Sequence, residues 1–91
     1  MEVTIKLGEP IWKVVGEKST RLALNGAQTL SDVLAELNRR YPAFMAELQR
    51  GAFNLSYTLF VNDTMVNWEK VGQTPVKDGD KVFIFMAVSG G

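Results

Sequence analysis

The residues of this chain best suited to chemistry lie at its C-terminal end, where an apolar run at 82–88 leads into Ser89, Gly90 and Gly91. Glycine has no side chain to pack, and it loses more conformational freedom on ordering than any other residue. The two glycines therefore add nothing to a core, and we predict that the functional group is the terminal carboxyl of Gly91. Because a C-terminal carboxyl is ionised at neutral pH, it becomes an acyl donor only after activation.

The residues from 87 to 91 also have the reach that such a role requires. At about 3.4 Å per residue, five extended residues span about 17 Å, which is enough to enter the active site of another protein. Gly90 and Gly91 carry no side chains that would obstruct a narrow channel, so their backbone can lie close to a nucleotide. We predict a flexible tail at about 87–91.

Several catalytic chemistries are excluded because the chain contains neither cysteine nor histidine. It cannot supply thiolate or imidazole zinc ligands, a Ser-His-Asp triad or a cysteine nucleophile. Asp78 and Asp80 could in principle hold magnesium, but the glycine between them is typical of a turn. We predict a protein that is not itself an enzyme, binds no metal and carries no intrinsic cofactor.

Composition narrows the possible partners and location. Ten basic residues balance ten acidic residues in 91, so no excess charge points to nucleic acid or to an anionic membrane. The longest apolar run has seven residues, well short of the roughly 20 needed to span a bilayer. The first residues, MEVTIKL, lack the pattern of a secretory signal. We expect a cytoplasmic protein with a single domain over 1–91.

Hydrophobic periodicity predicts two strands before a helix. Apolar residues at 3, 5 and 7 alternate with polar ones, and a second strand is expected within 11–24, most clearly at 20–24. Trp12 and Val14 are assigned either to the end of the first strand or to the start of the second. Thr29 then caps a helix whose apolar residues have helical spacing: Leu30, Val33, Leu34 and Leu37.

The second half of the sequence predicts a short helix and three further strands. The helix is expected at 42–51, and the strands are expected at 55–61, 64–68 and 81–87, with a loop at 72–79. The last strand is apolar enough to lie in the middle of a sheet. We therefore predict an α+β protein in which one sheet of four to five strands packs against a main helix.

Alternation along the last strand divides its side chains between two faces. If Val82, Ile84 and Met86 point toward the main helix, then Phe83 and Phe85 point to the opposite side of the sheet. Two exposed phenylalanines would favour a partner protein. The alternative is that the segment at 42–51 covers them as part of the core.

The order of these elements, together with three short motifs, resembles the ThiS/MoaD family of ubiquitin-like sulfur carriers. The motifs are VND at 61–63, DGDKV at 78–82 and the ending Val88-Ser89-Gly90-Gly91. The resemblance extends over essentially the whole chain and implies a ubiquitin-like β-grasp fold with a mixed sheet. Small subunits of molybdopterin synthase commonly have Pro-Pro before the ending, where this chain has Met86-Ala87, so the pathway stays open.

The resemblance also implies partners and a reaction. An E1-like adenylating enzyme would use ATP and magnesium to convert the Gly91 carboxylate into an acyl adenylate, and a sulfur donor protein would then leave a thiocarboxylate. Met65 aligns with a position that the family commonly exposes, so it is expected to dock partners together with Phe83 and Phe85. Val88 and Ser89 are expected to contact the partner as well.

The leading hypothesis is a sulfur carrier for molybdopterin biosynthesis that acts with a large synthase subunit. Carriers for thiamine, cysteine or tungsten-cofactor pathways are alternatives. A second hypothesis is a protein modifier that is joined through Gly91 to lysines of target proteins, because a lysine amine could attack the same adenylate. A third is a non-covalent ubiquitin-like binding module with an incidental tail.

Overall fold

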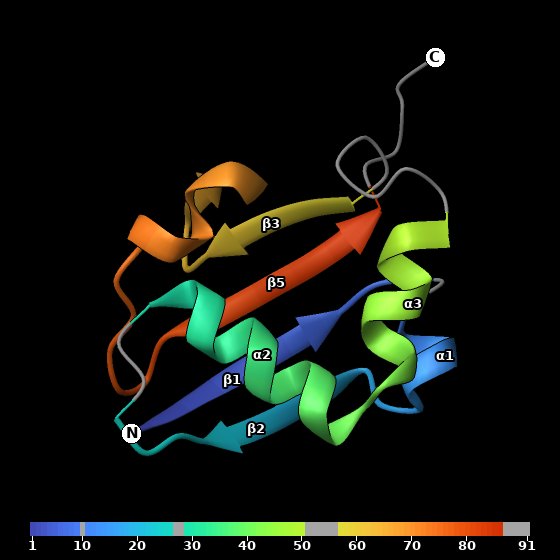
Figure 1. The fold of residues 1–91 in the computed structure, drawn as a ribbon, viewed down its shortest axis with the longest axis horizontal. Helices are drawn as coiled ribbons and strands as arrows, with labels where there is room; N and C mark the ends of the chain where they lie inside the picture. The colour runs from blue at the N-terminus through green and yellow to red at the C-terminus, as the bar shows by residue number, and fades with distance from the viewer. Residues whose placement is uncertain (10, 27–28, 51–56, 87–91) are drawn as a thin grey trace.

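A five-stranded mixed sheet forms the centre of the structure, and its helices α2 and α3 cover one face (Figure 1). The structure is a computed structural model that describes residues 1–9, 11–26, 29–50 and 57–86. The described elements, in chain order, are β1 (Glu2–Leu7), α1 (Ile11–Val15), β2 (Ser19–Ala23), α2 (Leu30–Arg40), α3 (Ala43–Arg50), β3 (Tyr57–Val61), β4 (Thr64–Val66), the 3-10 helix η1 (Trp68–Gln73) and β5 (Lys81–Met86).

The last strand lies in the middle of the sheet, as its apolar composition predicted. The strand order is β2-β1-β5-β3-β4. β5 pairs in parallel with β1 and antiparallel with β3, and Ile84 is paired with Leu7 on one side and with Leu59 on the other. The first and last described strands are thus paired directly, and the end of β5 lies next to the end of β1.

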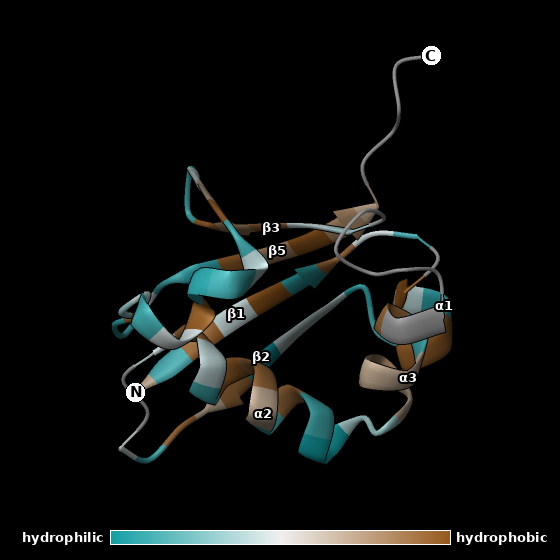
Figure 2. Cartoon of the chain, turned by 45° about the horizontal axis from the view of Figure 1, so that its top comes forward, coloured by the Kyte–Doolittle hydropathy of each residue, from teal (hydrophilic) through white to brown (hydrophobic). Residues whose placement is uncertain are grey.

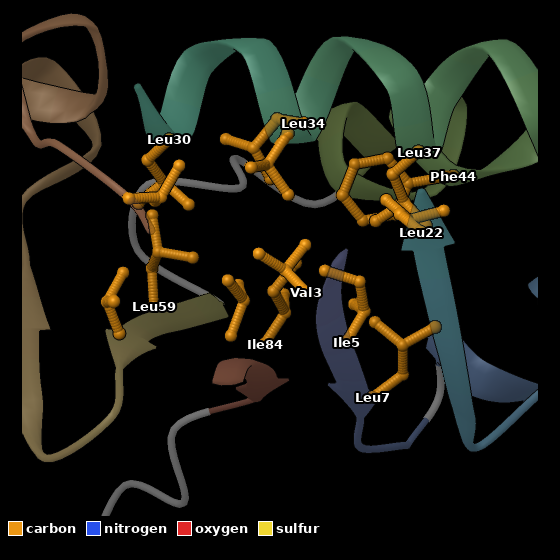
Figure 3. Close-up of a cluster of buried hydrophobic side chains, with 14 of the residues drawn as sticks. Val3, Ile5, Leu7, Leu22, Leu30, Leu34, Leu37, Phe44, Leu59 and Ile84 are labelled. Atoms are coloured by element: carbon orange, nitrogen blue, oxygen red, sulfur yellow. The ribbon is translucent and has the colours of Figure 1, made fainter. Parts of the chain in front are cut away.

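The core lies between the sheet and α2, where alternate strand residues meet one stripe of the helix (Figure 3). Val3, Ile5 and Ile84 are fully buried, as is Leu37 on the helix. Complete burial of an aliphatic side chain contributes about 1.5–3 kcal/mol. The predicted start of α2 is confirmed, because the side chains and backbone groups of Thr29 and Asp32 form a reciprocal capping box.

The expectation that Trp12 and Val14 belong to a strand is wrong. Residues 11–15 form the short helix α1, in which the Trp12 amide donates to the Gly8 carbonyl (3.0 Å) and the Gly16 amide donates to the Trp12 carbonyl (2.7 Å). After β1 the chain must reverse to form the antiparallel strand β2, and this helical turn makes the reversal. Gly16 ends it at a φ of 95°, which favours glycine.

Two further boundaries differ from the predicted ones. β4 ends at Val66, two residues before the expected end of the strand, and η1 then runs from the last residue of that expected strand into the first two residues of the expected loop. Asn67 makes this early helical turn possible, because its side chain accepts a hydrogen bond from the Glu69 amide (2.9 Å). The short helix α3 is confirmed over Ala43–Arg50, whereas Leu55 and Gly51 lie outside the described residues.

The turn at 78–80 fixes the start of β5 to two neighbouring segments. Asp78 accepts a hydrogen bond from the Glu2 amide (2.7 Å), and the buried Asp80 accepts from the Lys77 amide (2.9 Å) and from the Asn62 side-chain amide (3.1 Å). Both carboxylates therefore act in the turn, which Gly79 closes at a φ of 89°.

We predict that Asp80→Ala lowers the free energy of unfolding by about 1–3 kcal/mol, because it leaves two donors without their acceptor in a buried position. Urea denaturation would measure the change. Asp63→Ala is the matched control, since Asp63 is exposed in the turn between β3 and β4 and its substitution should cost less than about 0.5 kcal/mol. Equal stabilities for the two variants would contradict the role given to Asp80.

Candidate functional site

The central strand β5 carries the last described residues of the chain, so its end is the part of the C-terminal site that the structure describes. β5 ends at Met86. The predicted site residues Val88, Ser89, Gly90 and Gly91 lie outside the described residues. The described part of the site is therefore the end of β5 and the sheet surface around it.

Met86 is not buried as its position in the alternation predicted; 40% of it is exposed. The reason is its place at the end of the strand. The β1–β5 pairing stops at Leu7 and Ile84, so Met86 has a strand neighbour only on the β3 side, where it pairs with Tyr57. The core face of β5 is thus complete at Ile84, two residues before the strand ends.

Tyr57, the strand partner of Met86, is held by two side chains. Its hydroxyl donates to Glu47 on α3 (3.1 Å), and its carbonyl accepts from the indole nitrogen of Trp68 in η1 (2.9 Å). Both Tyr57 and Glu47 are buried. Since β3 begins at Tyr57, these contacts fix the start of β3 opposite Met86, the last residue of β5.

The sheet face opposite α2, which we call the outer face, carries an apolar cluster that we call the aromatic patch. It comprises Phe60, Met65, Phe83 and Phe85. Phe60 pairs with Phe83 across β3 and β5 and with Met65 across β3 and β4, and its ring stacks on that of Phe85 with centroids 5.7 Å apart. Figure 2 shows that much of β3 and β5 is hydrophobic.

The aromatic patch is open to solvent to a substantial degree. The exposed fractions are 65% for Met65 and 38% for Phe85, and Phe83 is half-buried. The alternative in which residues 42–51 cover the two phenylalanines is wrong, because Phe44 of α3 is buried in the core on the other face (Figure 3). Leu48 of α3 is buried in the same core. Phe83, Phe85 and Met65 are thus brought together as expected, and their role in partner binding stays a prediction.

Phe60 is a patch residue that the sequence analysis missed. The signal was present, because Leu59 and Val61 were expected to alternate within a strand and Phe60 stands between them. What the sequence could not supply was the register that sets Phe60 opposite Phe83. This pairing makes Phe60 the central member of the patch.

The described part of the site offers binding surface and strand geometry rather than reactive side chains. No helix among the described residues is long and apolar enough to cross a membrane. In the described ranges, no three residues of the metal-binding types gather into a group that could hold an ion. The strand that ends at Met86 also carries Phe83 and Phe85 of the aromatic patch.

The fold and this surface together define a ubiquitin-like β-grasp protein, with a mixed sheet, a main helix across it and a central last strand. A scan against models of protein families matches the ThiS family over residues 6–91. The chain belongs to this family of small ubiquitin-like carrier proteins. A search of curated proteins found no match.

Solved structures confirm the predicted β-grasp fold. SAMP1 (small archaeal modifier protein 1) from Methanosarcina acetivorans is 26% identical, with a TM-score of 0.75 over 99% of this chain and 96% of that chain. A chain of the BexX/CysO complex from Amycolatopsis orientalis is also 26% identical, with a TM-score of 0.73 over 98% and 99%. A chain of the complex of subunits 1 and 2 of molybdopterin-converting factor from Helicobacter pylori is 22% identical, with a TM-score of 0.64 over 100% of both chains.

Close packing of Gly8 against β5 gives a test of how the strand end is positioned. The Gly8 amide donates to the Ile84 carbonyl (2.9 Å), and a Cβ added at Gly8 would lie 2.6 Å from the Phe85 Cβ. We predict that Gly8→Ala destabilises the fold by about 1–3 kcal/mol, because Phe85 or the backbone must move.

The matched control is Gly72→Ala, where an added Cβ would meet nothing within 4 Å. Both substitutions restrict the unfolded chain alike, so the difference between their free energies of unfolding isolates the contact with Phe85. Thermal or urea denaturation would measure it. A Gly8→Ala variant as stable as Gly72→Ala would contradict the close packing.

Proposed function

We propose that this protein is a sulfur carrier whose reactive group is the C-terminal carboxylate of Gly91. The carboxylate oxygen attacks the α-phosphorus of ATP on an E1-like adenylating enzyme, and pyrophosphate leaves. A sulfide equivalent from a donor protein then attacks the acyl carbon, and AMP leaves. The product is a thiocarboxylate on Gly91, while ATP and magnesium belong to the partner enzyme.

The observation that carries this proposal is the family match over residues 6–91, which includes the C-terminal glycines. Two structural features support it. β5 lies between β1 and β3, so a rigid sheet leads directly to the segment that must reach the partner. The aromatic patch includes two β5 residues, Phe83 and Phe85, and thus lies on the strand that carries this segment.

A docked partner is part of the proposal. The chain resembles a chain of the BexX/CysO complex, and this likeness supports function together with a second protein. For the sulfur recipient we propose molybdopterin synthesis with a large synthase subunit, as the resemblance to the ThiS/MoaD family implies; the motifs at 78–82 and 88–91 are shared by carriers of other pathways. Thiamine, cysteine and tungsten-cofactor pathways are the alternatives for the recipient.

Intact mass of the untagged protein, purified from its own host, is the test of the carrier role. We predict a species heavier than the unmodified chain by the difference between one sulfur and one oxygen atom. Incubation with the adenylating enzyme, ATP and a sulfur source should increase this species, and deletion of Gly91 should abolish it. A chain that stays unmodified with an enzyme that does adenylate it would refute sulfur carriage.

A protein modifier is the second candidate, and the likeness to SAMP1 favours it as an alternative. A lysine amine would attack the same adenylate and form an isopeptide bond to Gly91. Because Lys81 is the last basic residue, trypsin would leave residues 82–91 attached to each modified lysine. Target peptides that carry this remnant would establish the modifier role, and their absence from cells that express the protein would reject it.

The aromatic patch gives a prediction about docking. We expect the double variant Met65→Ser, Phe85→Ser to raise the KM of the chain in ATP–pyrophosphate exchange by about 30-fold, because centrally placed apolar anchors contribute about 2 kcal/mol or more to binding. Val14→Ser is the matched control, since Val14 is an exposed apolar residue on α1 with an exposed fraction of 41%. An unchanged KM for the double variant would exclude this patch as the docking surface.

A further inference from the structure

The outer face has two unlike halves. The aromatic patch occupies β3, β4 and β5, whereas the other half carries three cations: Lys6 on β1, Arg21 on β2 and Lys81 at the start of β5. The residue next to each of them in the sequence (Ile5, Leu22 and Val82) is buried on the core face. Side chains alternate between the two faces of a strand, so the three cations lie on the outer face. We call these three residues the cationic cluster.

Strand register brings the cluster together. Thr4 pairs with Arg21 on one side and with Lys81 on the other, so the two cations lie in one row across three strands. With strands about 4.8 Å apart, their Cα atoms are about 10 Å apart. Lys6 lies two residues along β1 and pairs directly with Phe83, which joins the cluster to the aromatic patch.

The charges of the cluster are available to a partner. Of the cations in the described ranges, Lys13 pairs with Glu9 (2.8 Å), and Arg39 and Arg40 both pair with Glu36. Hydrogen bonds from these two arginines lower the pKa of the Glu36 carboxyl to about 2. No described carboxylate makes such an ion pair with a member of the cluster. Glu2, two residues before Thr4 on β1, is the one acidic residue among the outward positions of the described strands.

We infer that the outer face binds a partner protein whose own face is apolar in the centre and acidic along one flank, with the acidic flank over β1 and β2. This inference rests on the proposed function and specifies the partner's docking surface. An apolar patch alone allows rotation about the normal to the sheet. A cationic cluster on one side removes that freedom, because only one orientation pairs the charges and directs the chain beyond Met86 toward the partner's active site.

A protein surface fits these features better than a single-stranded nucleic acid does. Nucleic-acid grooves combine extensive positive charge with aromatic rings that are free to stack on bases. Here the net charge of the chain is zero, and the ring of Phe85 is already stacked on that of Phe60 at an interplanar angle of 9°. Three cations beside two rings that already stack on each other fit a partner protein with a few carboxylates at the rim of an apolar contact surface.

The test uses the host's E1-like adenylating enzyme that shows ATP–pyrophosphate exchange with this chain. The variant is the triple charge reversal Lys6→Glu, Arg21→Glu, Lys81→Glu, and the matched control is Lys13→Glu, Lys70→Glu, Lys77→Glu, which changes net charge equally at exposed positions off the outer face. Rim charges act mainly through the association rate and its salt dependence. We expect the first variant to raise KM by about 10-fold or more at low salt, with the difference shrinking at about 0.5 M salt.

The outcomes separate the two proposals. Suppose that the wild-type chain supports exchange. If the two triple variants raise KM equally, or if neither raises it, this inference is overturned and the carrier role is left standing. No exchange with any host adenylating enzyme would overturn the carrier role and this inference with it. Binding of a fluorescent oligouridylate by the wild-type chain, lost in the first variant alone, would reassign the outer face to single-stranded nucleic acid.

Discussion

The parallel pairing of β1 with β5 is the contact on which the rest of this structure depends. It joins the first and last described strands, and without it the sheet would separate into the β2–β1 pair and a three-stranded unit of β5, β3 and β4. The same pairing holds β5 in the middle of the sheet, aligns Lys6 with Phe83 and brings Gly8 against Phe85. The strand order and the central place of β5 therefore depend on one strand pairing, which also brings Lys6 beside Phe83 of the aromatic patch.

Much of the fold could be predicted because its signals are local. Thr29 and Asp32 stand three residues apart and cap the helix that their spacing indicated, and Leu30 to Leu37 supply a stripe with helical period. Alternation along β5 correctly assigned Ile84 to the core and Phe85 to the outer face. In such segments, propensity and burial favour the same structure.

The remaining features depend on contacts between residues far apart in the sequence. The short apolar segment at Trp12 and Val14 fits a strand or a helix equally well, and only the need to reverse the chain after β1 decides for the helix. Met86 follows the alternation of β5 but lies beyond its last partner on β1. Phe60 and the cationic cluster became visible only once strand register was known, because register is not a property of any single segment.

The central position of β5 also has a mechanical consequence. A partner that draws the chain beyond Met86 into its active site pulls along the axis of a strand that is hydrogen-bonded on both sides, to β1 and to β3. Such a load is carried in shear by the hydrogen bonds on both sides of β5, whereas an edge strand pulled along its axis would be held on one side only. A force applied to the chain beyond Met86 therefore has to break the hydrogen bonds on both sides of β5 before the strand leaves the sheet.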